Sequence, residues 1–374
     1  MRIKKIRIRN YKSLTDFSLE NLKPFCAFVG PNASGKSNIF EAIEFTNYAF
    51  RYSSEAPHFF GGKKRILSFN PIEVEDYESN ENTLAFYIEF FDRVIIDFFL
   101  KFVSFNNNDP LDDFRVARGH LIHKINKKIE MLDPFEIRNL NERDNFIADL
   151  RKAGLTYEND YEQFVDRFTR VFVKNYELVR GFGSPRIYSN SLLTDASNLE
   201  QILGYILEDK NKKDEFVEWL QILIPEFVNI EVRKSNLSSE YDFFIYEKGS
   251  NKPFPKELIS DGTYNILALM AAVFQNNQPQ FLCIEEPENG LHPQAIQSIV
   301  DLFREKSEKE GHYIWINTHS PTLVRCLKIR EIILVNKING KTVAKQLTED
   351  DNIDLKTDEA WLTNALGGGT LWST

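Results

Sequence analysis

The chain has few of the features that mark secreted or membrane proteins. Its 374 residues include only three cysteines, which show no paired metal-ligand spacing. No hydrophobic run approaches the roughly 18 to 20 residues that a membrane-spanning helix needs, and residues 1–5, M-R-I-K-K, do not open a secretory signal. Cys26 and Cys283 lie within apolar stretches. We therefore expect a cytoplasmic protein whose cysteines are reduced core thiols.

Positive charge is also in deficit. The sequence has 46 Lys and Arg against 55 Asp and Glu, which gives a formal net charge of −9. This argues against a protein that coats nucleic acid by bulk electrostatics, although a local basic groove would be hidden in the sum. With 42% hydrophobic and 27% charged residues, the composition is that of a folded globular protein. The length allows one large domain with insertions or two domains.

The most specific motif lies near the N-terminus. Residues 30–37 read G-P-N-A-S-G-K-S, the phosphate-loop pattern, between an apolar run at 25–29 and apolar residues at helical spacing. Backbone N–H groups of such a loop and the positive end of the next helix converge on polyphosphate. We expect Lys36 at the β- and γ-phosphates and the Ser37 hydroxyl on Mg²⁺. The candidate nucleotide ligands are Gly30, Pro31, Asn32, Ala33, Ser34, Gly35, Lys36, Ser37 and Asn38.

Hydrophobic patterning predicts a mixed α/β organisation around this loop. We expect strands at 2–9, 14–22, 25–29, 84–91, 93–103, 186–193, 228–233, 241–247, 281–286, 313–316, 331–335 and 342–347. Helices are expected after the loop and at 198–208, 213–223, 264–274 and 357–366. The domains predicted are an N-terminal lobe at 1–108, a helical insertion or lid at 109–185, a C-terminal lobe at 186–348 and a tail at 349–374. The insertion rests on apolar residues at helical spacing, such as Leu121, Ile125 and Ile129.

A second acidic motif follows the apolar run at 281–284. There Glu285 and Glu286 end a predicted buried strand, which is the Walker B pattern. Glu285 is expected to hold Mg²⁺ directly or through water, and Glu286 to orient or deprotonate the attacking water. A solvated strand end is the alternative, but the phosphate loop favours the catalytic interpretation.

Two further segments carry groups that suit phosphate. Ser260, Asp261 and Gly262 directly precede the apolar helix at 264–274, so their polar groups and the helix N-terminus can receive phosphate oxygens. His319 follows the apolar strand at 313–316, and ligands collect at the carboxyl ends of strands in an open α/β sheet. Taken singly, Ser260 would be an ordinary helix cap and His319 an ordinary polar strand end.

In this order, the motifs resemble the ABC-type ATPase heads of the RecF, SMC and OLD group. Residues 285–293, E-E-P-E-N-G-L-H-P, are similar to the D-E-P-E-x-x-L-H-P run of OLD-type ATPases, with Glu285 in place of the usual Asp. Residues 6–13 also resemble the first strand of those heads. The resemblance covers 1–103 and about 186–345, and it implies a P-loop NTPase fold of ABC type with N-terminal antiparallel strands. OLD nucleases continue into a Toprim domain, which we do not expect in this sequence.

The resemblance also implies a mechanism shared between two copies. In such heads each ATP lies between the phosphate loop of one protomer and the signature segment of the other. Ser260 and Gly262 would then contact ATP in trans, and His319 would sense the γ-phosphate. Asp261 departs from the glycine of the transporter-type signature, and no glutamine is assigned to a Q-loop.

Three functions are compatible with this resemblance. The first is an ATP-hydrolysing homodimer or higher oligomer, with Mg²⁺, that controls a separate effector protein in bacterial anti-phage defence or a toxin–antitoxin-like system. The second is a DNA-repair ATPase of RecF type, for which nucleic acid would be a partner. The basic face of residues 2–9 is then either a solvated edge or a DNA-facing rim. A transporter subunit is disfavoured by the altered signature, and we expect no membrane partner.

Overall fold

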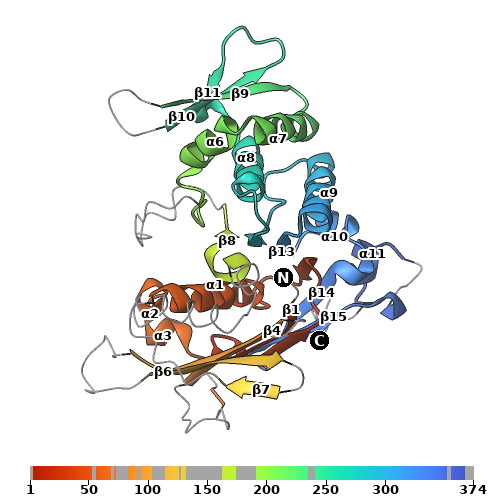
Figure 1. Cartoon of the computed structure of the whole chain (residues 1–374). Coiled ribbons are helices and arrows are strands. Elements are labelled where there is room, and N and C mark those ends of the chain that lie inside the picture. The colour runs from red at the N-terminus through yellow and green to blue at the C-terminus, as the bar shows by residue number, and fades with distance from the viewer. Residues whose placement is uncertain are drawn as a thin grey trace.

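A six-stranded sheet forms the core of the computed structural model (Figure 1), with the strand order β15-β14-β3-β13-β12-β8. The structure describes residues 3–52, 56–68, 71–72, 83–90, 94–102, 114–125, 128–131, 162–173, 191–234, 241–351 and 355–366. The core strands are β3 (Phe25–Val29), β8 (Phe168–Val171), β12 (Phe281–Glu285), β13 (Tyr313–Thr318), β14 (Ile332–Ile338) and β15 (Lys341–Gln346). All neighbours pair in parallel except β14 and β15, which form an antiparallel hairpin.

Helices and a small sheet cover one face of the core sheet. They comprise α6 (Leu199–Glu208), α7 (Lys210–Leu223), α8 (Asp261–Phe274), α9 (Pro293–Glu310) and α10 (Pro321–Arg325). A three-stranded antiparallel sheet lies beyond α6 and α7 (Figure 1). Its strands are β9 (Phe227–Lys234), β10 (Tyr241–Glu247) and β11 (Phe254–Pro255). A 3₁₀ turn, Lys256–Leu258, connects β11 to α8.

The other face of the core sheet packs on α1 (Lys36–Tyr52) and a second six-stranded sheet. That sheet is antiparallel and consists of β1 (Ile3–Tyr11), β2 (Leu14–Glu20), β4 (Thr83–Phe90), β5 (Val94–Phe102), β6 (Phe114–Ile125) and β7 (Lys128–Met131). The short helices α2 (Ala56–Phe59) and α3 (Lys63–Ile66) follow α1. The C-terminal part adds α11 (Thr357–Leu362), and short 3₁₀ turns lie at Ile329–Glu331 and Glu349–Asp351.

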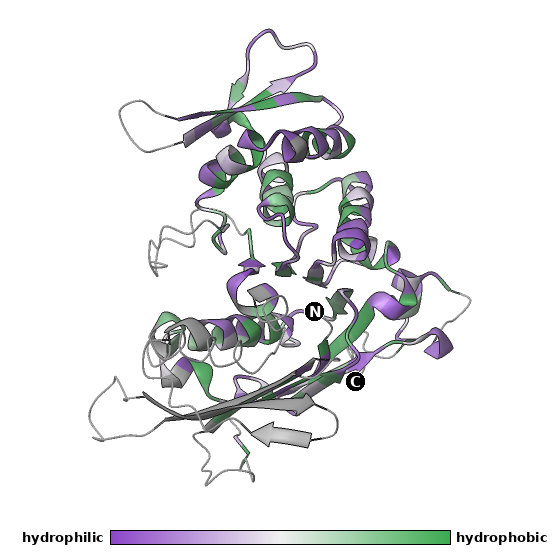
Figure 2. Cartoon of the chain, in the orientation of Figure 1, coloured by the Kyte–Doolittle hydropathy of each residue, from purple (hydrophilic) through white to green (hydrophobic). Residues whose placement is uncertain are grey.

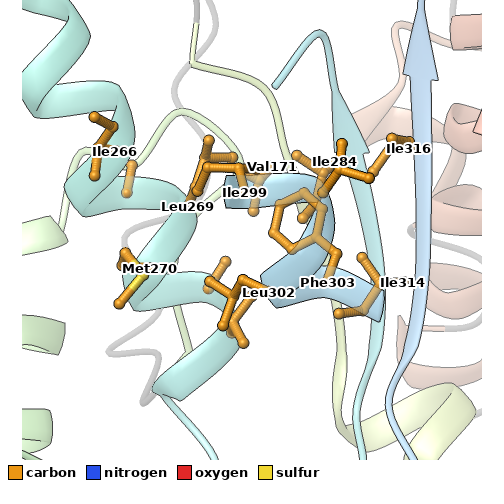
Figure 3. Close-up of a cluster of buried hydrophobic side chains, with 14 of the residues drawn as sticks. Val171, Ile266, Leu269, Met270, Ile284, Ile299, Leu302, Phe303, Ile314 and Ile316 are labelled. Carbon is orange, nitrogen blue, oxygen red and sulfur yellow. The ribbon is translucent and has the colours of Figure 1, made fainter. Parts of the chain in front are cut away.

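Strand β3 explains why the core has two halves. Its five residues are all buried, with Phe25, Ala27 and Val29 in the cluster beneath the helices and Cys26 and Phe28 in the cluster beside α1. A strand covered on both faces needs an apolar run of this kind. Figure 3 shows the helix side, where residues of α8 and α9 meet Val171, Ile284 and Ile316 of the sheet. Figure 2 shows that α8 is largely hydrophobic, as expected of a helix with ten buried residues.

The α/β class, the mixed sheet and the N-terminal antiparallel strands are confirmed, but the helical character predicted for 109–185 is wrong for residues 114–125, 128–131 and 168–171. Residues 114–125 and 128–131 are strands of the antiparallel sheet, and Phe168–Val171 is a core strand. The short π-helix Glu162–Asp166 precedes that strand. A spacing of four residues is even and therefore fits the two-residue period of a strand as well as a helix; Leu121 and Ile125 both lie on β6, and Ile129 lies on β7. The strand expected at 186–193 lies largely outside the described residues, and the described residues 191–193 are not in a strand.

Candidate nucleotide site

The phosphate loop is held in place by the β14–β15 hairpin. A Cβ on Gly30 would lie 2.1 Å from the Val335 carbonyl oxygen, and a Cβ on Gly35, whose φ is +101°, would lie 1.9 Å from Thr342 Oγ1. Only glycine fits these close approaches. Thr342 Oγ1 also donates to the Ser34 carbonyl at 3.0 Å. The loop therefore has one packed shape. The Ile39 N–H donates to the Gly35 carbonyl at 3.2 Å, and the earlier N–H groups of α1, which lack acceptors within the helix, suit a ligand.

Lys36 is buried at the start of α1, close to three acids. Its Nζ donates to the carbonyl oxygens of Gly30 at 2.7 Å and Pro31 at 2.9 Å. Burial lowers the pKa of Lys36 to about 8, although the nearby charges of Glu286, Glu288 and Glu285 favour its protonated form. A partly desolvated ammonium with neutral partners suits an incoming phosphate. Within the described residues, the buried Ser34 hydroxyl of the same loop has no hydrogen-bond partner, which also fits an oxygen-rich ligand.

Ser37 and Glu285 place two oxygen donors side by side. Ser37 Oγ donates to Glu285 Oε2 at 2.5 Å, which joins the start of α1 to the end of β12. Burial opposes ionisation of Glu285, but the Arg170 guanidinium and the hydrogen bond from Ser37 outweigh it and lower the pKa of the carboxyl. A hydroxyl and an ionised carboxylate are the hard ligands that Mg²⁺ prefers alongside phosphate oxygens, so this pair fits the predicted metal site.

Glu286 and His319 face each other across the ends of β12 and β13. Glu286 Oε1 lies 3.4 Å from His319 Nδ1. The backbone of Glu286 is left-handed, with a φ of 47°, and its N–H donates to the backbone oxygen of Asn317 at 3.0 Å and to Asn317 Oδ1 at 3.1 Å. A non-glycine residue held in this conformation is unusual, and such residues cluster at functional sites.

The predicted signature segment packs on the loop that follows Glu286. Ser260 caps α8 by accepting from the Thr263 N–H at 3.1 Å, and Ser260 and Asp261 are exposed. A Cβ on Gly262 would lie 2.4 Å from the Gly290 carbonyl oxygen, so the two backbones are in direct contact. Among the described residues, no hydrogen bond or ion pair joins Ser260–Gly262 to the phosphate loop.

The fold thus gathers most of the predicted residues and separates one group. Lys36, Ser37, Glu285, Glu286 and His319 come from three strand ends of the core sheet that lie side by side, while Ser260, Asp261 and Gly262 lie on α8. Asn38 contributes outside the loop, because its Nδ2 donates to Ser13 Oγ at 2.7 Å.

Sequence reasoning missed several partners of these side chains. Arg170 on β8 donates from Nε to Glu285 Oε1 at 2.7 Å, and Asn289 donates from Nδ2 to Glu286 Oε2 at 3.1 Å. Thr318 Oγ1 donates to Glu288 Oε1 at 2.5 Å. For Arg170, the available signal was an arginine within the otherwise uncharged and largely apolar run at 168–173.

Comparison with known proteins agrees with this geometry. A family model described as "AAA domain, putative AbiEii toxin, Type IV TA system" matches residues 25–325, which include the phosphate loop, Ser260–Gly262, Glu285, Glu286 and His319. The chain belongs to this family. It is an ABC-type ATPase of the RecF, SMC and OLD group.

Two curated relatives are longer than this chain. The OLD nuclease of Thermus scotoductus is 23% identical, over 93% of this chain and 65% of that protein. The chromosome partition protein Smc of Methanocaldococcus jannaschii is 54% identical over 43 residues, which are 12% of this chain and 4% of that protein. The chain thus spans less than two thirds of either relative.

Solved structures support the fold of this AAA-family ATPase. An Smc head domain derived from Pyrococcus furiosus, bound to the C-terminal domain of ScpA, has a TM-score of 0.53 and 14% identity, with 94% of this chain and 97% of that chain covered.

Among the described residues, none of the helices has the length and apolar character to cross a membrane.

Proposed function

We propose that this protein binds and hydrolyses ATP and uses the cycle as a dimeric switch for a separate effector. The observation that carries the proposal is the convergence of Lys36, Ser37, Glu285, Glu286 and His319 on one edge of the core sheet. A cation and an oxygen pair suited to Mg²⁺ can hold the phosphates and the metal, and a carboxylate and an imidazole can position the attacking water and stabilise phosphoryl transfer to it.

Each group has a proposed role that follows from its surroundings. Lys36 would contact the β- and γ-phosphates, and Ser37 and Glu285 would hold Mg²⁺, which neutralises charge on the phosphates when bound. Glu286 would accept a proton from the attacking water, since Asn289 and the backbone contacts to Asn317 fix its position. His319, beside Glu286, would donate a hydrogen bond to the γ-phosphate or to that water.

The signature segment is the reason for proposing a dimer. Ser260 and Asp261 are exposed at the N-terminus of α8, a position suited to an anion, and their contacts are with α8 and the 286–290 loop. A second copy, arranged head to tail, would bring this segment to the phosphate loop of its partner. ATP would then favour the closed pair and hydrolysis the open one, because the contacts differ between the two states.

Two variants test the chemistry. Lys36→Ala should lose nucleotide affinity, as measured with a fluorescent ATP analogue. Glu286→Gln should still bind ATP, accumulate as a dimer in light scattering and turn over about 10² to 10⁴ times more slowly. Glu308→Gln, an exposed acid on α9, is the matched control and should behave as wild type. Turnover of Glu286→Gln at the wild-type rate would refute the proposed base.

The effector role draws support from the family description, which names a toxin and a toxin–antitoxin system. Its test is co-purification from native cells, followed by assay of the partner with wild-type protein and with Glu286→Gln. A partner whose nuclease, RNase or toxin activity follows the nucleotide state supports this role. A partner indifferent to both proteins contradicts it.

A DNA-binding ATPase is the second candidate, favoured by the local identity with the chromosome partition protein Smc. The basic residues of β1 weigh against a DNA-facing rim there, since Lys4, Lys5 and Arg7 each lie within 2.7 Å of a carboxylate oxygen. A gel shift that requires ATP and weakens with salt would favour this candidate. Its absence at low salt would remove it.

A further inference from the structure

Arg170 is a buried cation that ties together the elements around the proposed metal site. It lies on β8 opposite Cys283 of β12, and its side chain is only 11% exposed. Its guanidinium donates to Glu285 Oε1 from Nε at 2.7 Å and also from Nη2, while Nη1 donates to Glu44 Oε2 of α1 at 2.7 Å. One guanidinium thus bridges the acid at the end of β12 and an acid on the helix after the phosphate loop.

The two acids would be poorly tolerated without it. The side chains of Glu285 and Glu44 are 1% and 11% exposed, and a buried carboxylate without a partner is strongly disfavoured. Thr194 donates a further hydrogen bond to Glu44 Oε1 at 3.1 Å, but it brings no charge. Arg170 reduces the formal charge of this group from −2 to −1.

The bonds also divide the Glu285 carboxylate between two tasks. Oε1 receives both guanidinium donors and Oε2 receives the Ser37 hydroxyl, so Oε2 alone faces the proposed metal position. A single Glu285 carboxylate thus contacts Arg170 and Ser37 together.

We propose that Arg170 acts as a built-in cation that keeps a divalent metal ion from binding Glu285 until nucleotide phosphates supply the remaining ligands. The inference rests on the proposed metal roles of Ser37 and Glu285. Without the guanidinium, the ionised carboxylates of Glu285 and Glu44 would leave a charge of −2 beside the Ser37 hydroxyl, and a hard divalent cation is attracted to such oxygen donors. When the guanidinium is present, its positive charge repels a metal ion. The negative charge of the phosphate oxygens is then needed to offset this repulsion.

Mn²⁺ binding, followed by electron paramagnetic resonance, tests this without any turnover. The wild-type protein should bind Mn²⁺ with a non-hydrolysable ATP analogue and bind it at least about tenfold more weakly alone. Arg170→Met should bind Mn²⁺ without nucleotide, at least about tenfold more tightly than wild type. Arg170→Lys keeps the positive charge and should bind Mn²⁺ as weakly as wild type in the absence of nucleotide.

Glu44→Gln gives a change of opposite sign. It removes one negative charge, although the amide oxygen can still accept from Arg170 Nη1, so the guanidinium charge is less compensated and Mn²⁺ should bind the nucleotide complex at least about threefold more weakly. A loss of structural integrity would weaken binding in both variants, whereas the proposal requires opposite directions. Arg304→Met is the matched control, because Arg304 pairs with Glu331 and Asp301 away from the phosphate loop.

The results separate this inference from the proposed function. If wild-type protein with nucleotide binds no Mn²⁺, the proposed metal site itself fails. If it does, but folded Arg170→Met and Glu44→Gln leave Mn²⁺ binding unchanged, only the role of Arg170 is refuted. Should Arg170→Met not fold, an unchanged Mn²⁺ affinity in Glu44→Gln would still overturn the proposal.

Discussion

Nucleotide affinity should depend on pH through Lys36, whose pKa burial lowers from 10.5 to about 8. Phosphate prefers the charged ammonium, so deprotonation of the free protein competes with binding. With a pKa of about 8, roughly half of the Lys36 side chains are charged at pH 8 and about a tenth at pH 9. ATP affinity should therefore fall about fivefold between these pH values and approach tenfold per unit above them.

The pH dependence of folding stability has the opposite sign to that of ATP affinity. Below pH 8 Lys36 is charged in both the folded and unfolded chain, and the folded protein carries the full cost of burying the charge. As the pH rises from 8 to 10.5, the folded protein loses its proton first and the cost disappears. The nucleotide-free protein should therefore gain up to about 3 kcal/mol of stability from this residue over that window. Affinity and stability should change in opposite directions.

Isothermal titration calorimetry in buffers of different ionisation enthalpy measures the ATP affinity and the proton uptake, and denaturant unfolding at each pH measures the stability. At pH 8 ATP binding should take up about half a proton, and at pH 9 about 0.9. The phosphate itself contributes little there, since its second pKa is near 6. Lys36→Arg cannot lose its charge and serves as the control with a flat profile. An ATP affinity that is constant from pH 7 to 9.5, with no proton uptake, would refute the reasoning.

Three further variants test separate parts of the structure. Gly262→Ala should lower the free energy of unfolding by about 1–3 kcal/mol, because its Cβ would lie 2.4 Å from the Gly290 carbonyl oxygen, and thermal melting measures this loss. The variant should also lower the ATPase rate in steady-state kinetics. His319→Ala should slow hydrolysis while leaving ATP affinity within about threefold, and an equal loss of both would mean that it serves binding. Trp361→Ala should cost about 3–5 kcal/mol in denaturant unfolding, since the indole is only 5% exposed, yet ATP affinity should be unchanged.

The site was predictable where function depends on the ends of strands. The phosphate loop, the double acid and the Thr-His-Ser segment each follow an apolar run, and parallel strands bring their carboxyl ends to one edge. Strand β3 and strand β10 have the bounds expected from the sequence. Ser260 caps α8 as its position before an apolar helix suggested. Trp361 packs on the core, and Trp372 lies outside the described residues.

Features that depend on distant pairing were not predictable in the same way. Arg170 reaches Glu285 only because β8 pairs with β12, and the prediction of a helical insertion at 109–185 included no strand there. The contact between Gly262 and Gly290 likewise requires α8 to dock on a loop that comes later in the chain. A periodic pattern reports local conformation, whereas these contacts are set by how elements pack.

The close approach of Gly262 and Gly290 has a mechanical consequence. Asn265 of α8 also donates to the Asn289 carbonyl at 2.8 Å, while the Asn289 side chain holds Glu286. With no side chain between the two backbones, a displacement of α8 cannot be absorbed by a rotamer change and passes directly to the segment that carries Glu286. In the proposed head-to-tail pair, contact of α8 with the ATP of the partner would thus align Glu286 at the ATP of its own protomer. Hydrolysis at the two sites would then be coupled.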